Sequence, residues 1–196
     1  MVLASDFLDS MAWTVSASGI LLAAGAILLR SGGRSASVEQ KDRDLQLGLA
    51  AAIGACGFYL LVSGLAISFE WPFALSSGVY NVLFGGIATL GGLVLLAGVT
   101  AVLLKADLRP VSYFAAVAGL YSVIDAYAIY KYSLTNSPLL AALGYLSFAA
   151  PAFLSVPAAQ SKNKLWLWLF VLFALVFAAA WLYQAGNFTL MHLQPS

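Results

Sequence analysis

Residues 108–133 read L-R-P-V-S-Y-F-A-A-V-A-G-L-Y-S-V-I-D-A-Y-A-I-Y-K-Y-S, and this stretch decides the fold class. From Pro110 to Tyr132 it would extend about 34 Å as an α-helix, long enough to cross a bilayer. It contains one carboxylate, Asp125, about 10 Å from its Tyr132 end. Because a charge in hydrocarbon is costly, Asp125 is expected to face protein or water. The stretch therefore predicts a membrane-spanning helix with a polar side chain inside it.

The composition of the whole chain supports a membrane protein and excludes several other classes. Hydrophobic residues make up 62% of the 196 positions and charged residues 9%, a balance that no soluble domain of this length would have. The net charge of +1 gives no indication of nucleic-acid binding. A single cysteine cannot form an internal disulfide, and a single histidine excludes the usual His-cluster metal sites. We therefore expect contact with the lipid bilayer and no nucleic acid, cofactor or metal.

Six apolar segments are long enough to span a membrane. The predicted spans are residues 7–29, 47–68, 79–104, 110–132, 138–156 and 165–183. Between the first two lies a polar, turn-rich connector, and an aromatic loop with a proline precedes the third. Pro151 is expected to break or kink the fifth span, and Pro157 to end it. The prediction is an all-α, six-span membrane protein, with residues 1–196 forming one domain.

The basic residues predict the orientation in the membrane. Eight of the nine lysines and arginines fall in the connectors between spans 1–2, 3–4 and 5–6, and only Lys131 falls on the other side. The positive-inside rule then places both termini outside the cytoplasm, in a cell membrane. Asp125 would lie in the outer half of the bilayer. Asn187-Phe188-Thr189 matches a glycosylation sequon on that side, a motif common by chance, so modification of Asn187 is left open.

The spans are predicted to form three similar helix hairpins. Span 1 carries G-I-L-L-A-A-G-A-I-L-L-R and span 3 carries G-G-L-V-L-L-A-G-V-T-A-V-L-L-K, which suggests a parallel repeat. Small residues recur at helical spacing and would allow close helix packing, although they could instead line a narrow polar path. Those assigned to packing are Gly54, Gly57, Gly85, Ala88 and Gly92. Span 6 has bulky aromatics on every face, so we expect it to face lipid or a neighbouring subunit.

The motifs of common membrane enzymes are missing from the sequence. There is no Gly-x-Ser-x-Gly with a membrane-embedded histidine, no Cys-x-x-Cys and no Gly-x-x-x-x-Gly-Lys. No D-x-x-x-D pair is present, and the single D-x-x-D pair, Asp6 and Asp9, stands at the N-terminal edge of the first span, so paired carboxylates give no indication of Mg²⁺-diphosphate chemistry. We therefore predict that the protein is not an enzyme and has no catalytic residues.

Polar residues near the outer face form the candidate binding site. Asp125, Asn81 and Glu70 are the vestibule or pore candidates, together with Tyr121 and Ser122 one turn before Asp125. The alternative is that Asp125 is a structural anchor, bonded to hydroxyl groups on a neighbouring helix or paired with Lys131. The sequence leaves both interpretations open.

Two local resemblances add to this interpretation. L-L-A-A-G-A-I-L-L-R-S-G (residues 21–32), and the stretch from Arg109-Pro110-x-Ser112-Tyr113 to Tyr132-Ser133, are similar to helices one and four of the AmiS/UreI amide and urea channels. That resemblance implies three hairpins around a pore in each protomer and assembly as a ring. The Trp-rich fifth helix of that family is here residues 139–150, without tryptophan, and its glutamate in helix six has no counterpart. F-E-W-P-F with Y-N-V-L-F-G also resembles uncharacterised small polytopic membrane proteins of archaea and bacteria.

Two functions follow as hypotheses. The first is a small-solute channel or facilitator with an outer vestibule near Asp125, assembled as a homo-oligomer. The second is a non-catalytic accessory subunit of a larger membrane complex, whose contact surfaces would be span 6 and the small residues. The sequence identifies neither the solute nor the oligomeric state.

Overall fold

The computed structural model describes residues 3–31, 36–70 and 78–193, and these form six helices. The helices are α1 (Leu3–Ser31), α2 (Ala36–Glu70), α3 (Val79–Leu103), α4 (Arg109–Tyr132), α5 (Pro138–Gln160) and α6 (Lys164–Leu193). Each is long and apolar enough to cross a membrane. The predicted all-α chain with six membrane-spanning helices is therefore confirmed by length and composition.

In three places a helix extends beyond the predicted membrane span. α2 begins at Ala36, so most of the expected polar connector is helical, because its Glu, Gln, Lys and Arg residues are good helix formers. α5 contains Pro151 and Pro157 and continues to Gln160. Each proline removes only one intrahelical hydrogen bond, and the rest of the backbone must still be satisfied within the helix in lipid. α6 extends ten residues past the predicted end at Tyr183 for the same backbone reason. Most of the predicted aromatic loop before α3 lies outside the described residues.

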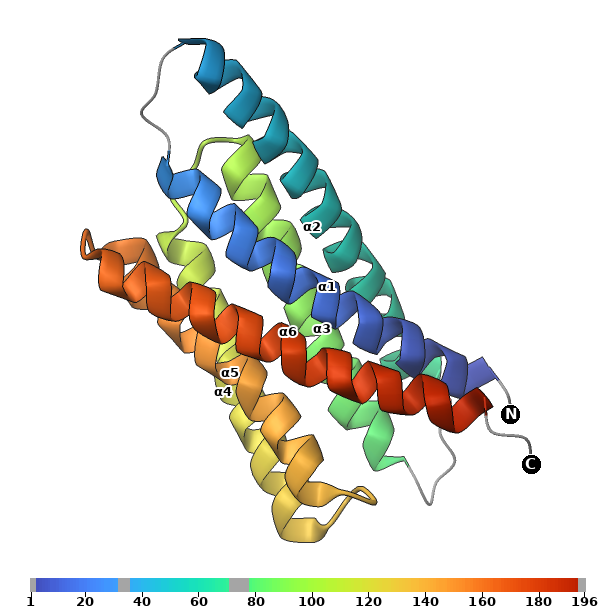
Figure 1. Ribbon diagram of the computed structural model, residues 1–196. Coiled ribbons are helices and arrows are strands. Elements are labelled where there is room, and N and C mark those ends of the chain that lie inside the picture. Colours follow the sequence, from blue (N-terminus) through green and yellow to red (C-terminus); the bar gives the residue numbers. More distant parts are fainter. Residues whose placement is uncertain (1–2, 32–35, 71–77, 194–196) are drawn as a thin grey trace.

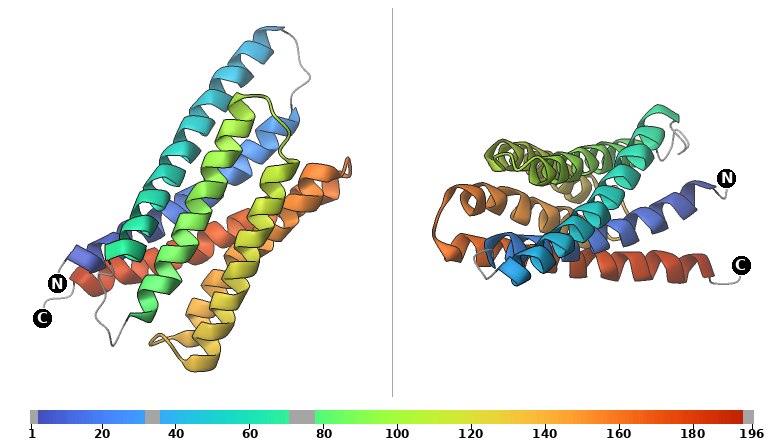
Figure 2. Two further views of the ribbon diagram at one scale, coloured as in Figure 1. Left: turned by 180° about the vertical axis from the view of Figure 1, so that it is seen from behind. Right: turned by 90° about the horizontal axis from the view of Figure 1, so that it is seen from above.

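The helices are arranged as a closed ring. Each helix contacts its neighbours in sequence, and α6 returns to contact α1. Figure 1 shows α1 and α6 side by side, crossing the other helices at an angle, with the two chain termini at the same end. Figure 2 shows α2, α3 and α4 in a row from behind, with α5 beside α4. The first and last helices therefore close the ring.

The two ends of the ring differ. The basic end, defined here by the connectors 104–108 and 161–163, carries Lys105, Arg109, Lys162 and Lys164. The terminal end is defined by the connector 133–137 together with the start of α1 and the end of α6. The largest buried apolar cluster joins α1, α3, α4, α5 and α6 and includes Ala12, Leu83, Ile129, Tyr145 and Trp181. Most of its members lie in the half of their helix nearer the terminal end, where side chains fill the ring.

Only one face of α6 is exposed, although its bulky residues suggested exposure to lipid or a neighbouring subunit all round. Ala174 and Ala185 are fully buried, and Phe177 and Trp181 are nearly so. A Cβ atom built on Gly19 of α1 would lie 2.9 Å from the carbonyl oxygen of Ala174, so α1 and α6 approach at backbone distance. Alanines on one face of α6 allow this approach. The opposite face, with Trp168, Leu172 and Leu175, is exposed as expected.

Candidate functional site: a cavity enclosed by the six helices

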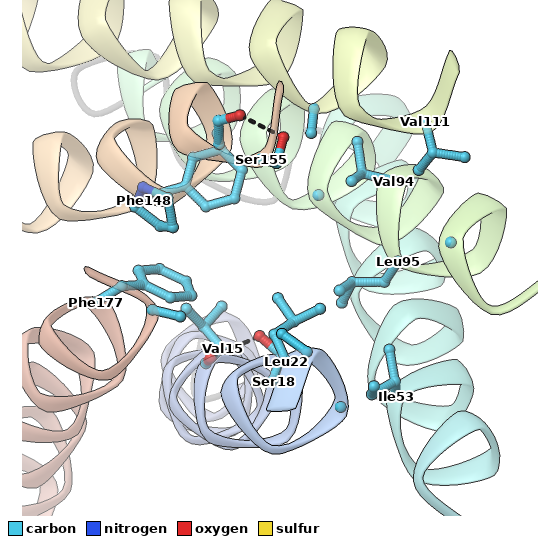
Figure 3. A pocket seen from close by; sticks show the side chains of 18 of the residues that line it. Val15, Ser18, Leu22, Ile53, Val94, Leu95, Val111, Phe148, Ser155 and Phe177 are labelled. Atoms are coloured by element: carbon cyan, nitrogen blue, oxygen red, sulfur yellow. Dashed lines mark hydrogen bonds between the residues drawn. The ribbon is translucent and has the colours of Figure 1, made fainter. Parts of the chain in front are cut away.

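A cavity of about 750 Å³ lies inside the ring, and all six helices contribute to its wall. Figure 3 shows side chains from several helices around the opening, with Phe148 and Phe177 beside one another at one edge. The rings of these two residues meet edge to face, with centroids 5.6 Å apart. Most lining side chains are aliphatic or aromatic, such as Leu22, Ile53 and Leu95. The wall therefore offers a mainly apolar environment within the bundle.

The lining residues show how far the cavity extends along each helix. Gln46 and Asp107 line it toward the basic end. On α4 the lining residues run from Val111 to Ser122 and do not extend into the last part of the helix. Tyr145 and Trp181 belong both to the cavity wall and to the buried cluster at the terminal end. On α1 and α6 the wall reaches further toward the chain termini, to Leu8 and Phe188.

The predicted vestibule residues do not share one surface. Asp125 and Asn81 are buried, with 5% and 0% of their surface exposed, whereas Glu70 is exposed at the end of α2. Tyr121 is half-buried, and its hydroxyl lies 3.5 Å from the carbonyl oxygen of Val82. Of the five candidates, only Ser122 lines the cavity.

Asp125 lies one turn beyond Ser122 on α4, outside the wall of the cavity. It is close enough to Tyr121 and Tyr145 to interact with them electrostatically. Its Oδ2 atom is buried and accepts no hydrogen bond from the described residues. Lys131, the alternative partner considered from the sequence, instead has its Nζ atom 5.2 Å from the centre of the Tyr127 ring. Asp125 is thus buried near Tyr121 and Tyr145 with one oxygen unsatisfied.

Tyr145 connects the cavity with the surroundings of Asp125, and sequence reasoning missed it. Its hydroxyl donates to the carbonyl of Leu83 at 3.0 Å, and its own carbonyl accepts from Ser122 Oγ at 2.8 Å. Trp181, also missed, donates from Nε1 to the carbonyl of Gly144 at 3.2 Å. A buried Tyr or Trp usually needs such a partner. The signal in the sequence was the single tyrosine of α5, directly after Gly144.

Comparison with known proteins identifies a family without assigning a function. Residues 1–195 match the family model described as a protein of unknown function (DUF981). The chain belongs to the DUF981 family. No curated protein and no solved structure matches the chain. The ring and its cavity are therefore the features of this DUF981 protein from which a function must be argued.

The packing glycines of the DUF981 chain lie mainly between α2 and α3. A Cβ atom on Gly92 would lie 2.5 Å from the amide nitrogen of Leu61, and one on Gly57 would lie 3.1 Å from the carbonyl oxygen of Gly92. A Cβ on Gly85 would lie 2.6 Å from Ser68 Oγ. Gly54 is less tightly enclosed, since its Cβ would lie 3.7 Å from Val99. Ala88 is buried and lines the cavity.

The mouth of the cavity in this DUF981 protein carries an ion pair. Asp107 accepts hydrogen bonds from the backbone amide of Arg109 at 2.9 Å and from its Nε at 2.6 Å. These bonds lower the pKa of the Asp107 carboxyl below its usual value. The carboxylate also faces the positive end of the α4 dipole.

Among the described residues, no group of three or more His, Cys, Asp or Glu side chains could hold a metal ion. The sequon Asn187-Phe188-Thr189 lies within α6.

Proposed function

We propose that this protein is a channel or facilitator that carries a small neutral solute across a cell membrane through the cavity inside its ring of helices. The observation that carries the proposal is the closed ring of six membrane-spanning helices around a cavity of about 750 Å³. Small-molecule sites in helical proteins are commonly cavities of this size between helices. Because all six helices contribute side chains to the wall, a solute in the cavity would lie within the bundle.

The chemistry of the wall selects the class of solute. An ion in a mainly apolar cavity loses its hydration without receiving compensating charges, so ions are disfavoured. Asp107, the charged residue that lines the cavity, is already paired with Arg109. The resemblance to the AmiS/UreI channels favours the same class, because amides and urea are small and neutral. Short-chain aliphatic amides are therefore the first solutes to test.

The orientation and the hairpin grouping complete the proposal. Both termini lie outside the cytoplasm, as the basic residues predict, so the basic end of the cavity faces the cytoplasm. The chain is a repeat of three hairpins and assembles as a homo-oligomer. Asp125 acts near the outer end, where the solute leaves or enters the path beyond Tyr145.

Flux measurements on reconstituted protein test the proposal. Proteoliposomes should take up acetamide or propionamide faster than protein-free liposomes in a stopped-flow assay. Val94 lines the cavity, whereas its neighbour Leu93 is exposed. Val94→Phe should therefore reduce flux toward the protein-free rate, and Leu93→Phe should not.

Two results would argue against a channel. Equal flux with and without protein for every amide tested would remove the support for transport. Tight co-purification with larger unrelated subunits, together with no flux, would favour the accessory-subunit function instead. Equal effects of Val94→Phe and Leu93→Phe would show that the path does not run through the cavity.

A further inference from the structure

The serine side chains that line the cavity use their hydroxyl protons in bonds to backbone carbonyls. Four serines line the cavity, and each hydroxyl donates to a backbone carbonyl. Ser18 donates to Val15 at 2.7 Å, and Ser112 donates to Arg109 at 2.8 Å. Ser155 donates to Ala152 at 2.6 Å, and Ser122 donates to Tyr145 across the α4–α5 contact at 2.8 Å.

The same holds for the two aromatic residues with polar atoms. Tyr145 O–H donates to the carbonyl of Leu83, and Trp181 Nε1–H donates to the carbonyl of Gly144. Backbone N–H groups in the helical walls are used by the carbonyls of the preceding turn. The two other polar side chains in the wall, Gln46 and Asp107, lie toward its basic end. The interior of the cavity is therefore poor in available donors.

Acceptors remain available in the same interior. A serine hydroxyl that donates its proton keeps two lone pairs, and a helical carbonyl oxygen has a second lone pair. Figure 3 shows Ser155 and Ser18 on opposite sides of the opening, so acceptors are present on two walls.

We infer that the ligand of this cavity is a neutral molecule with an apolar body whose polar group donates hydrogen bonds. An acceptor without a donor loses its bonds to water on entering such a cavity and gains none there. A donor such as O–H or N–H can bond to a serine oxygen. This inference specifies the class of ligand for the proposed function. It rests on one part of that function, namely that the cavity is the site of the solute.

Matched ligands of equal shape test the inference by binding rather than by flux. Cyclohexanol carries a donor, cyclohexanone carries only an acceptor, and methylcyclohexane carries neither. Affinity for the protein in nanodiscs is measured by the ligand-induced rise in unfolding temperature, with empty nanodiscs used to correct for partition into lipid. Cyclohexanol is expected to bind about threefold to tenfold more tightly than cyclohexanone, the range of one neutral hydrogen bond.

Serine variants locate the effect in the cavity. Ser112→Ala/Ser155→Ala removes two acceptor oxygens from one wall, and the preference for cyclohexanol should fall toward unity. Ser147→Ala is the matched control, because Ser147 also donates to a carbonyl three residues earlier on α5 but does not line the cavity. This control should keep the full preference.

Each contrary result has a distinct meaning. Equal or tighter binding of cyclohexanone to the wild-type protein would overturn the donor inference while leaving the proposed function intact. A preference for cyclohexanol that persists in Ser112→Ala/Ser155→Ala would overturn the role of these serines. If none of the three compounds binds, the cavity is not a solute site, and the proposed function fails with the inference.

Discussion

Tyr145 of α5 donates a 3.0 Å hydrogen bond to the backbone carbonyl of Leu83 in α3, and both residues are buried. Within the described part of the chain, α3 and α5 are not neighbours in the ring, since α4 lies between them. The bond therefore joins α3 to α5 past α4, close to Ser122, the last residue of α4 that lines the cavity. Small residues on that face, Ala118 and Ser122, leave room for the tyrosine ring.

Tyr145→Phe should destabilise the protein without changing its helix content. The variant keeps the ring but removes the bond to Leu83, a loss of about 0.5–1.5 kcal/mol in the free energy of unfolding. Unfolding monitored by circular dichroism in detergent measures the change. Tyr130→Phe removes the same atom from an exposed tyrosine and should have little effect. Equal stability of both variants would mean that the Tyr145 bond contributes nothing.

Neighbouring glycines in α3 should respond differently to the same substitution. A Cβ on Gly92 would lie 2.5 Å from the amide nitrogen of Leu61 and 2.6 Å from the carbonyl oxygen of Gly57, so Gly92→Ala forces α2 and α3 apart. We expect a loss of about 1–3 kcal/mol. Gly91 has no atom within 4 Å of its added Cβ, so Gly91→Ala should be neutral or slightly stabilising because alanine favours the helix. Thermal unfolding of the two variants tests the α2–α3 contact, and a tolerated Gly92→Ala would contradict it.

The orientation of the chain can be tested at two exposed connector positions. Ala106 lies between α3 and α4, and Asn136 lies between α4 and α5, so the two positions are on opposite sides of the membrane. With Cys56 replaced by alanine, an impermeant thiol reagent should label Asn136→Cys in intact cells but not Ala106→Cys. Both should react after permeabilisation. The reverse pattern would put the basic end of the cavity outside the cytoplasm. Ser35 and Gln194, which the sequence alone would suggest for this test, lie outside the described residues.

Asp125 is the position at which stability and function should separate. Its Oδ2 atom is buried and accepts no hydrogen bond from the described residues. Asp125→Asn therefore removes the carboxylate without breaking a hydrogen bond to Oδ2. We expect the free energy of unfolding to stay the same or rise, while amide flux changes. Flux into proteoliposomes, measured beside thermal unfolding, distinguishes the two effects. Unchanged flux with lowered stability would indicate a structural anchor and would remove Asp125 from the transport path.

The sequence predicted the number and the type of the helices. Runs of about twenty apolar residues admit few alternatives in a membrane, because every backbone polar group must be satisfied within the helix. The same physics explains the errors at Pro157 and Tyr183, where the helices continue beyond the residues chosen as ends. The amino-acid composition changes at Pro157 and after Tyr183, but the backbone there still requires hydrogen bonds within the helix.

The neighbours of each helix could not be obtained from the sequence. In a soluble protein an apolar face points to the core, whereas in a membrane the core-facing and lipid-facing sides are both apolar. From its aromatic residues α6 was therefore expected to face lipid or a neighbouring subunit, although one of its faces packs against α1 and α5 and buries Ala174 and Ala185. The alanines of α6 are apolar like its lipid-facing residues, so hydropathy did not distinguish the packed face of α6 from the exposed one. The contact by which α6 closes the ring was therefore not predicted.

The candidate site was only partly foreseen. From the sequence, Asp125 could be recognised as an unusual intramembrane carboxylate, since the cost of burying charge depends on residue type and depth. Only the tertiary structure decided that Ser122 and Tyr145 line a common cavity while Asp125 lies one turn beyond it. Chain length and hydropathy determine how many times the chain crosses a membrane. Which side chains surround a shared space depends on contacts between helices far apart in sequence, and these are set by small differences in side-chain volume that the apolar pattern does not encode.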